Sequence, residues 1–244
     1  MLSSKDSVQR VGRVALHAGD TQWAYAQRHS GEIEKHWRQA KAATPTFFNG
    51  IIYLIEHIEM GQDQFFGRLI KTDFKSYLFW RDNGFKADAG VADGFGSALI
   101  RSAEGHIILG RQRPGNVNSG LAYLPGGFID GRDIDEHGAA DVAQSVAREL
   151  SEETGLGAAE LDPQPGFIVT RTGAHVSFAV DYRSHLTSDE LAARISAHIA
   201  ADPDPELSSV VVIKCCEDCA GVAMPPYAKI LLAHLFPTPV RRNA

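Results

Sequence analysis

The sequence predicts an α+β fold in which a mixed β-sheet lies between helices, preceded by a small N-terminal α/β region. First, strand-like and helix-like segments follow one another without the strict alternation of a parallel α/β protein. Second, a stretch rich in glycine, alanine and aspartate, DAGVADGFG, separates two parts of the chain with different patterns. We therefore expect an N-terminal helix and hairpin region over residues 1–92 and a larger domain over residues 93–244.

The N-terminal region is expected to hold helices and one hairpin. Residues 15 to 43 have a helical pattern that is broken near RHSGE and stopped by Pro45. IIYLIEHIEM and QFFGRLI predict two strands that are joined by a turn at Gly61. A short helix follows, with Thr72 as its expected N-cap and Gly84 just past its end.

The second region begins with a hairpin, SALIRSAEGHIILGRQR, and continues with a strand that runs into a glycine turn, LAYLPGGFID. The remaining predicted elements are a helix, two strands, a helix, a strand and a closing helix, over DVAQSVARELSEETG, GFIVTRTGAHVSFAVDY, TSDELAARISAHIAA, ELSSVVVIKC and YAKILLAHLF. This mixture predicts a mixed sheet covered by helices.

Composition limits the function classes. The net charge of −6 argues against a general nucleic-acid-binding surface, although a local basic pocket for a phosphate remains compatible. The first 20 residues lack the apolar core of a signal peptide, and no apolar run reaches the roughly 18 residues of a membrane span. The three cysteines, all in CCEDC, give only a weak zinc signal. We expect a cytoplasmic protein without membrane association, for which a homodimer is compatible.

The segment RELSEETGL places three carboxylates on one arc near the end of a helix. Asp141 and Gln144 match a capping box at the start of this helix, and Gly155 ends it. Carboxylates at i, i+3 and i+4 repel one another and the negative helix end, at a cost of about 1 kcal/mol. A divalent cation would offset this repulsion, whereas a solvated acidic helix end is the alternative explanation.

These residues, together with the preceding glycine turn and hairpin, resemble the Nudix hydrolases over roughly residues 95 to 235. The Nudix signature is G-x5-E-x7-R-E-U-x-E-E-x-G-U, where U is aliphatic. Its second half is complete here, and PGG at 125–127 matches the glycine entry; the matching positions are Arg148, Glu149, Leu150, Glu152, Glu153, Gly155 and Leu156.

The first half of the signature is altered. Asp133 stands six residues after Gly127, where the signature has glutamate, and Arg148 lies 21 residues after Gly127 instead of 14, so seven residues have been added. Either Asp133 or Glu136 could take the role of the missing glutamate. Because Asp141 caps the helix, we expect the added residues to form a mobile surface loop over residues 128–140. Such a loop would shape substrate access rather than bind metal.

The resemblance implies hydrolysis of the pyrophosphate bond in a nucleoside diphosphate linked to another moiety, with Mg²⁺ or Mn²⁺ as cofactor. The expected metal ligands are Glu149, Glu152, Glu153 and, from a later loop, Glu206. The expected catalytic residues are the three helix glutamates and Arg148, which more readily orients a carboxylate than contacts substrate. The expected substrate-binding residues are Arg111, Arg113, Gly126 and Gly127.

The N-terminal region carries a weaker resemblance to larger Nudix proteins such as UDP-sugar hydrolases, through PTFFNG and TDFK. Its aromatic residues could stack on a base or sugar, or could simply form a core; they are Trp37, Phe47, Phe48, Phe74, Tyr77 and Trp80. The competing function is a catalytically silent Nudix domain that senses a nucleotide or binds a partner. The intact R-E-L-x-E-E favours an active enzyme.

Overall fold

The computed structural model describes residues 6–237, so the extreme ends of both expected regions, residues 1–5 and 238–244, lie outside it. The main sheet has eight strands, six of them in the order β1 (Ser7–Val11), β10 (Phe167–Thr172), β11 (His175–Ser184), β5 (Asp93–Arg101), β6 (Ile107–Gln112) and β12 (Leu207–Ile213). The two others are β7 (Ala122–Tyr123), which pairs with β6, and β9 (Leu161–Pro163), which pairs with β11. The second sheet has the order β3 (Ile51–Met60), β4 (Gln64–Asp73), β2 (Arg13–Gln22) and β8 (Ala139–Ala140).

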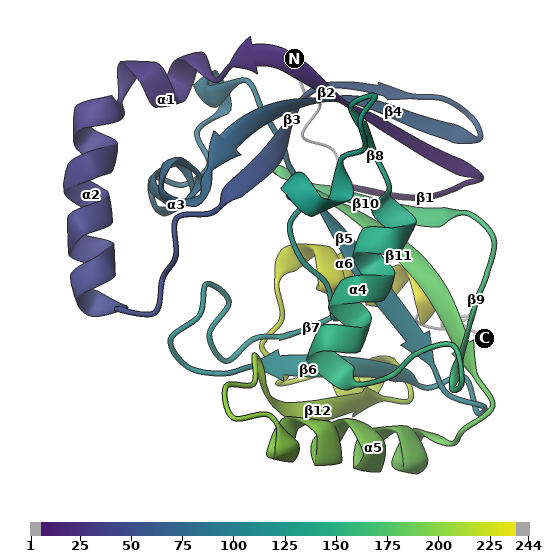
Figure 1. Cartoon of the computed structure of the whole chain (residues 1–244). Coiled ribbons are helices and arrows are strands. Elements are labelled where there is room, and N and C mark those ends of the chain that lie inside the picture. The colour runs from purple at the N-terminus through teal and green to yellow at the C-terminus, as the bar shows by residue number, and fades with distance from the viewer. Residues whose placement is uncertain (1–5, 238–244) are drawn as a thin grey trace, which may run out of the picture.

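The main sheet is mixed and carries helices on both faces, which confirms the predicted fold class. Strands β5 and β11 are parallel, and the other pairs of this sheet are antiparallel. Successive strand residues face opposite sides, so Ile100 packs in the same core as Val146 of α4 (Val142–Thr154), whereas Leu99 packs with Leu231 of α6 (Pro226–Leu235). Figure 1 shows α4 in front of this sheet and α6 behind it.

The other helices lie at the periphery. Helix α5 (Ser188–Ala201) packs beside β12, and α3 (Phe74–Asp82) packs against α2 (Ser30–Ala43), which follows the short α1 (Ala24–Arg28). In Figure 1, α1 and α2 lie at the left, beyond α3. None of the helices within residues 6–237 combines the length and apolarity that crossing a membrane requires.

Two predictions in the N-terminal region are wrong. The segment expected to be helical from residue 15 begins as strand β2, and helix starts only at Ala24. The reason is tertiary: β2 pairs in parallel with β4, which buries Ala15 and Leu16. The N-cap of α3 is Asp73 rather than Thr72, because the Asp73 carboxylate accepts a hydrogen bond from the Ser76 backbone N–H at 3.1 Å.

The enlarged loop is tied to the second sheet, which the sequence did not indicate. Its strand β8 pairs with β2, and the backbone N–H of Ala18 donates to the Gly138 carbonyl at 2.7 Å. The Asp135 carboxylate closes the turn by accepting from the backbone N–H groups of His137 and Ala139, each at 2.8 Å. The loop was expected to be mobile on the surface; instead, backbone pairing with β2 holds it in place.

The N-terminal region shares its core with the second region. Strand β1 pairs with β10 at the edge of the main sheet, and the Phe65 ring packs edge-on against Phe178 with centroids 4.8 Å apart. Ile55 contacts the backbone of β5 so closely that a Cβ on Gly94 would meet its Cδ1 at 2.5 Å. The expected boundary at residue 92 lies immediately before β5. Strand pairing and side-chain packing nevertheless connect the residues on its two sides.

Candidate active site

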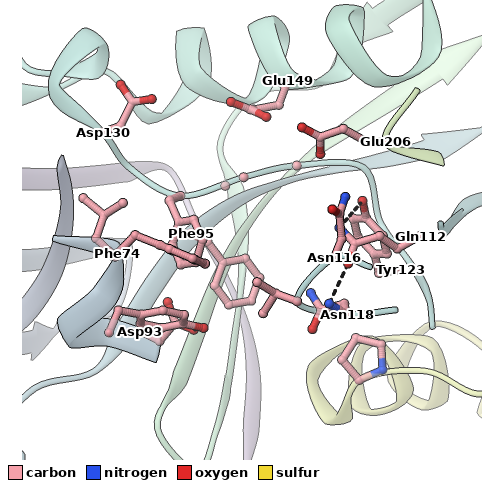
Figure 2. Close-up of a pocket in the computed structure, with 18 of the residues that line it drawn as sticks. Phe74, Asp93, Phe95, Gln112, Asn116, Asn118, Tyr123, Asp130, Glu149 and Glu206 are labelled. Carbon is pink, nitrogen blue, oxygen red and sulfur yellow. Dashed lines mark hydrogen bonds between the residues drawn. The ribbon is translucent and has the colours of Figure 1, made fainter. Parts of the chain in front are cut away.

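A cavity of about 1200 Å³ lies between the glutamate-bearing side of α4, the loop after β6 and the N-terminal region. Figure 2 shows Glu149 and Glu206 on one side of it and Asp93 on the other, with Phe95 between them. The cavity therefore has an acidic end and an aromatic end. The two ends come from sequence segments that are far apart.

Glu153 is the most enclosed of the four glutamates of the site, with 5% of its surface exposed. Its Oε1 accepts a hydrogen bond from the Tyr123 hydroxyl at 2.8 Å, and its Oε2 accepts one from the Gly126 N–H at 3.1 Å. Burial raises the pKa of Glu153 well above its ordinary value, and the negative charges of Glu206 and Glu149 raise it further. Ionisation of Glu153 therefore costs free energy unless a cation binds beside it.

Glu149 is held by Arg148, which also reaches the enlarged loop. The Arg148 Nη1 lies 2.5 Å from Glu149 Oε1, and its Nη2 donates to Asp133 Oδ1 at 3.0 Å. Burial also raises the pKa of Glu149, against the opposing effect of Arg148. Arg148 does not line the cavity, so its contacts are those of a group that orients carboxylates, the role expected for it.

The sequence left Asp133 and Glu136 as two candidates for the role of the missing signature glutamate, and the contacts of Asp133 fit that role. It is buried, and its Oδ2 accepts hydrogen bonds from the Ser145 hydroxyl at 2.9 Å and from the Asp130 N–H at 3.0 Å. The Glu136 side chain, by contrast, is 87% exposed. Asp133 therefore takes the signature position six residues after Gly127, and the added residues follow it.

The glycine turn packs directly against the acidic groups. Gly126 has a φ of 157°, and a Cβ there would lie 2.2 Å from the Gly96 carbonyl oxygen. A Cβ on Gly127 would lie 2.7 Å from the Glu149 carboxyl carbon. Both glycines line the cavity. They are needed because backbone and carboxylate approach here more closely than a side chain allows.

Glu206 and Glu152 complete the acidic end. Glu206 precedes β12, and partial desolvation in the cavity wall raises its pKa although much of the side chain stays exposed; Glu152 and Asp204 add to this effect. The Glu152 side chain is 54% exposed and lies 3.5 Å from Arg148 Nη1. Both glutamates line the cavity with Glu149, although they are not adjacent in the sequence.

The donor chemistry of these residues fits a hard divalent cation. All the side chains offer carboxylate oxygen, the ligand that Mg²⁺ and Mn²⁺ prefer, and three of them carry raised pKa values that a cation would relieve. Within residues 6–237 no group of three or more acidic, histidine or cysteine side chains is placed to hold a metal ion by itself. Mg²⁺ keeps several of its waters and completes its shell with phosphate oxygens, so one or two carboxylates can suffice for it.

The two predicted arginines are placed differently. Arg113 lines the cavity, and its Nη1 lies 2.5 Å from Asp204 Oδ1. Arg111 is not in the cavity wall and donates to the Gly120 carbonyl at 2.8 Å. Sequence reasoning missed Arg132, whose guanidinium lines the cavity 3.9 Å from both Glu149 and Glu152. Arg132 precedes Asp133 in the enlarged loop, and its position there gave no signal, because only folding returns that loop to α4.

The aromatic end comes largely from the N-terminal region. Phe47, Phe48, Phe74 and Tyr77 line the cavity, together with Phe95 and Phe128 from the second region. The Tyr77 and Phe128 rings pack edge-on with centroids 4.8 Å apart. Trp37 and Trp80 do not line it, and Trp80 is buried in the N-terminal core. The expected aromatic set therefore divides into cavity wall and core.

The raised pKa of Glu153 predicts how stability depends on pH in a chelator. Its contribution to stability is fully present below the ordinary glutamate pKa of 4.5 and is lost as pH rises toward the raised value, because the folded state then holds a costly carboxylate. Relative to wild type, Glu153→Gln should therefore gain thermal stability as pH rises from 5 to 8. Mg²⁺ should stabilise wild type more than this variant at pH 8. Thermal unfolding of both proteins, with chelator or Mg²⁺, measures the difference; parallel pH profiles would contradict it.

The contacts of Asp133 predict a role in holding Arg148. Asp133→Asn removes the negative charge from the Arg148 contact, and we expect metal affinity to fall by roughly 10-fold because Glu149 loses its fixed partner. Asp135→Asn, which loosens the same loop without touching Arg148, is the matched control and should change metal affinity much less. Mn²⁺ titration followed by calorimetry distinguishes the two. Equal effects of both variants would mean that loop order, not the Asp133 contact, matters.

Comparisons with known proteins agree with this geometry. Residues 92–211 match the family model described as NUDIX domain. No curated protein gives a significant match to the sequence. Similar solved structures include the Nudix hydrolase RenU from M. smegmatis, which is 17% identical, with 58% of this chain and 82% of that chain covered and a TM-score of 0.40. The MutT protein from Methanosarcina mazei Go1 is 20% identical, with 59% and 91% covered and a TM-score of 0.39.

At these identities and TM-scores the solved structures add no weight, so the assignment depends on the family model and on the motif itself. The matched residues contain the glycine turn, the complete R-E-L-x-E-E helix and Glu206. The structure brings these three segments to one end of one cavity. Residues 92–211 of the chain therefore form a domain of the Nudix family.

Proposed function

We propose that this protein hydrolyses the pyrophosphate bond of a nucleoside diphosphate linked to another moiety, with Mg²⁺ or Mn²⁺ held by Glu149, Glu153 and Glu206 and assisted by Glu152. The observation that carries the proposal is the enclosed Glu153 carboxylate, whose pKa is raised by burial and by Glu206 and Glu149, both of which line the cavity; Glu153 itself lies behind the lining, hydrogen-bonded to Gly126 of the wall. Such a cluster is costly in a protein that uses it only for packing.

The chemistry follows from the charge of the substrate. A pyrophosphate group repels hydroxide, and a bound divalent cation would neutralise it and lower the pKa of the attacking water. The residues of this chain would hold and orient the reacting groups. One glutamate would take the proton from water, and Arg148 would keep Glu149 in place. Arg113 and Arg132, at the rim, would hold phosphate oxygens.

The shape of the cavity supports a nucleotide rather than a small inorganic phosphate. About 1200 Å³ far exceeds the needs of two phosphate groups, and the remaining wall is largely aromatic. Rings such as Phe74 and Phe95 offer flat faces for a base or sugar. We infer that the N-terminal region, residues 1–92, serves to complete this end of the substrate site.

A panel of nucleoside diphosphate derivatives tests the proposal. ADP-ribose, UDP-glucose and related compounds would be incubated with Mg²⁺, Mn²⁺ or chelator, and the products identified by chromatography. Cleavage between the two phosphates yields two monophosphates, whereas attack elsewhere yields a diphosphate. Metal-dependent cleavage of at least one compound is expected. Tight binding of nucleotides without turnover, under every metal condition, would instead favour a catalytically silent sensor.

A further inference from the structure

Asp93 is a buried acid at the aromatic end of the cavity, away from the metal-binding glutamates (Figure 2). It is the first residue of β5, which lies inside the main sheet beside β11. Its backbone N–H donates to the Ala174 carbonyl at 2.7 Å, and it stands opposite His175 in the parallel register. The sheet therefore fixes the Asp93 backbone, and with it the place where the carboxylate begins.

The two oxygens of Asp93 have unequal surroundings. Oδ2 accepts a hydrogen bond from the Tyr77 hydroxyl at 3.0 Å and lies 3.8 Å from His175 Nε2. Oδ1 is shielded from solvent and has no hydrogen-bond partner within residues 6–237. With 3% of the residue exposed, this unpaired oxygen carries a desolvation cost of about 1–3 kcal/mol, and buried polar atoms are rarely left so.

The side chains around Asp93 in the cavity wall are aromatic rings. His175 packs against Phe85 and Phe95, with ring centroids 4.6 and 6.4 Å away, and all three residues line the cavity with Tyr77. Flat rings on either side suit a planar or cyclic ligand group. Rotation of such side chains opens the wall at far lower cost than movement of the sheet backbone.

We propose that Asp93 Oδ1 accepts a hydrogen bond from an N–H or O–H group on the cyclic part of the ligand beyond the phosphates, and so sets which substrates bind. This inference rests on the proposed function for the idea that a nucleotide occupies the cavity. The donor is either the edge of the base or a hydroxyl of the attached sugar. A site built to accept a hydrogen bond rejects a ligand that lacks the donor, because the buried acceptor then stays unpaired.

The test measures binding rather than turnover, so it is independent of whether hydrolysis occurs. Calorimetry with Mg²⁺ would compare UDP with N3-methyl-UDP and GDP with N1-methyl-GDP, pairs that differ in one ring N–H. UDP-glucose compared with UDP isolates the sugar. The proteins are wild type, Asp93→Leu, which keeps the branched shape of the side chain but has no hydrogen-bond acceptor, and Asp88→Leu, the same change at an exposed aspartate outside the cavity wall.

If the base supplies the donor, methylation should weaken binding to wild type about 10- to 100-fold, which corresponds to about 1.4–2.7 kcal/mol. Asp93→Leu should lose most of this discrimination while Asp88→Leu keeps it. If the sugar supplies it, Asp93→Leu should abolish the extra affinity of UDP-glucose over UDP and leave the methylation effect unchanged.

Ligand discrimination unchanged within twofold in a folded Asp93→Leu protein would overturn the inference and leave Asp93 as a support for Tyr77. Should that variant not fold, wild type alone decides: equal affinities within each methylated pair, together with equal affinities for UDP and UDP-glucose, would also overturn it. Absence of hydrolysis across the substrate panel, with ligand discrimination retained, would refute the proposed function and not the assignment of Asp93.

Discussion

Replacing Glu153 with glutamine is expected to lower kcat by on the order of 10²-fold or more while the protein keeps its fold, because a metal ligand contributes several kcal/mol to transition-state stabilisation. The fold should survive because glutamine preserves the volume of a side chain that is only 5% exposed. Its amide can also keep both present partners: the carbonyl oxygen can accept from Gly126, and the Tyr123 hydroxyl can turn to accept from the amide. Steady-state hydrolysis of the best substrate in the panel measures the effect.

The matched control for this experiment is Glu136→Gln. It removes the same charge from an exposed side chain in the added loop, outside the cavity wall, and should leave kcat within about twofold. Circular dichroism would verify that both variants are folded. Near-normal turnover in Glu153→Gln, or full activity of wild type in excess chelator, would refute the metal-dependent mechanism.

Removing residues 1–92 is expected to abolish cooperative folding of the remaining chain. The deletion leaves the β10 edge without β1 and takes Ile55, Phe65 and Leu69 out of the core that surrounds Phe178. Truncating a single buried side chain of this size costs about 2–5 kcal/mol, and a domain has only about 5–15 kcal/mol in total. Denaturant unfolding followed by fluorescence and far-ultraviolet circular dichroism should show no cooperative transition for residues 93–244.

Phe65→Ala provides a graded version of the same experiment in the full chain. It keeps every strand and removes only the ring that meets Phe178, so the free energy of unfolding should fall by about 3–5 kcal/mol. Supplying residues 1–92 as a separate chain should restore some folding to the truncated protein. A fragment 93–244 that unfolds cooperatively and hydrolyses substrate as well as the full chain would show that the N-terminal region is dispensable.

Local signals in the sequence determined much of the second region. The start of α4 at its cap Asp141 and its end at Gly155 depend on residues within a few positions of one another, and the structure confirms both. The Nudix motif is similarly local, because its glutamates share one turn of one helix. Glu206 became a candidate through the family resemblance, which implies a further acid from a later loop, and the structure brings it to the same cavity.

Tertiary structure alone decided the features that depend on distant pairing. Residues 15–22 form a strand because β4 lies alongside, although their own pattern favoured a helix. The enlarged loop was expected to be mobile, yet β2 pairs with it, and Arg132 of this loop lies beside Glu149. Asp93 was hidden in a glycine-rich linker, and only the sheet register places it under the rings of the cavity. The physical reason is common to all three: local sequence sets helix turns and caps, whereas strand partners and cavity walls are chosen by burial between segments that lie far apart in the chain.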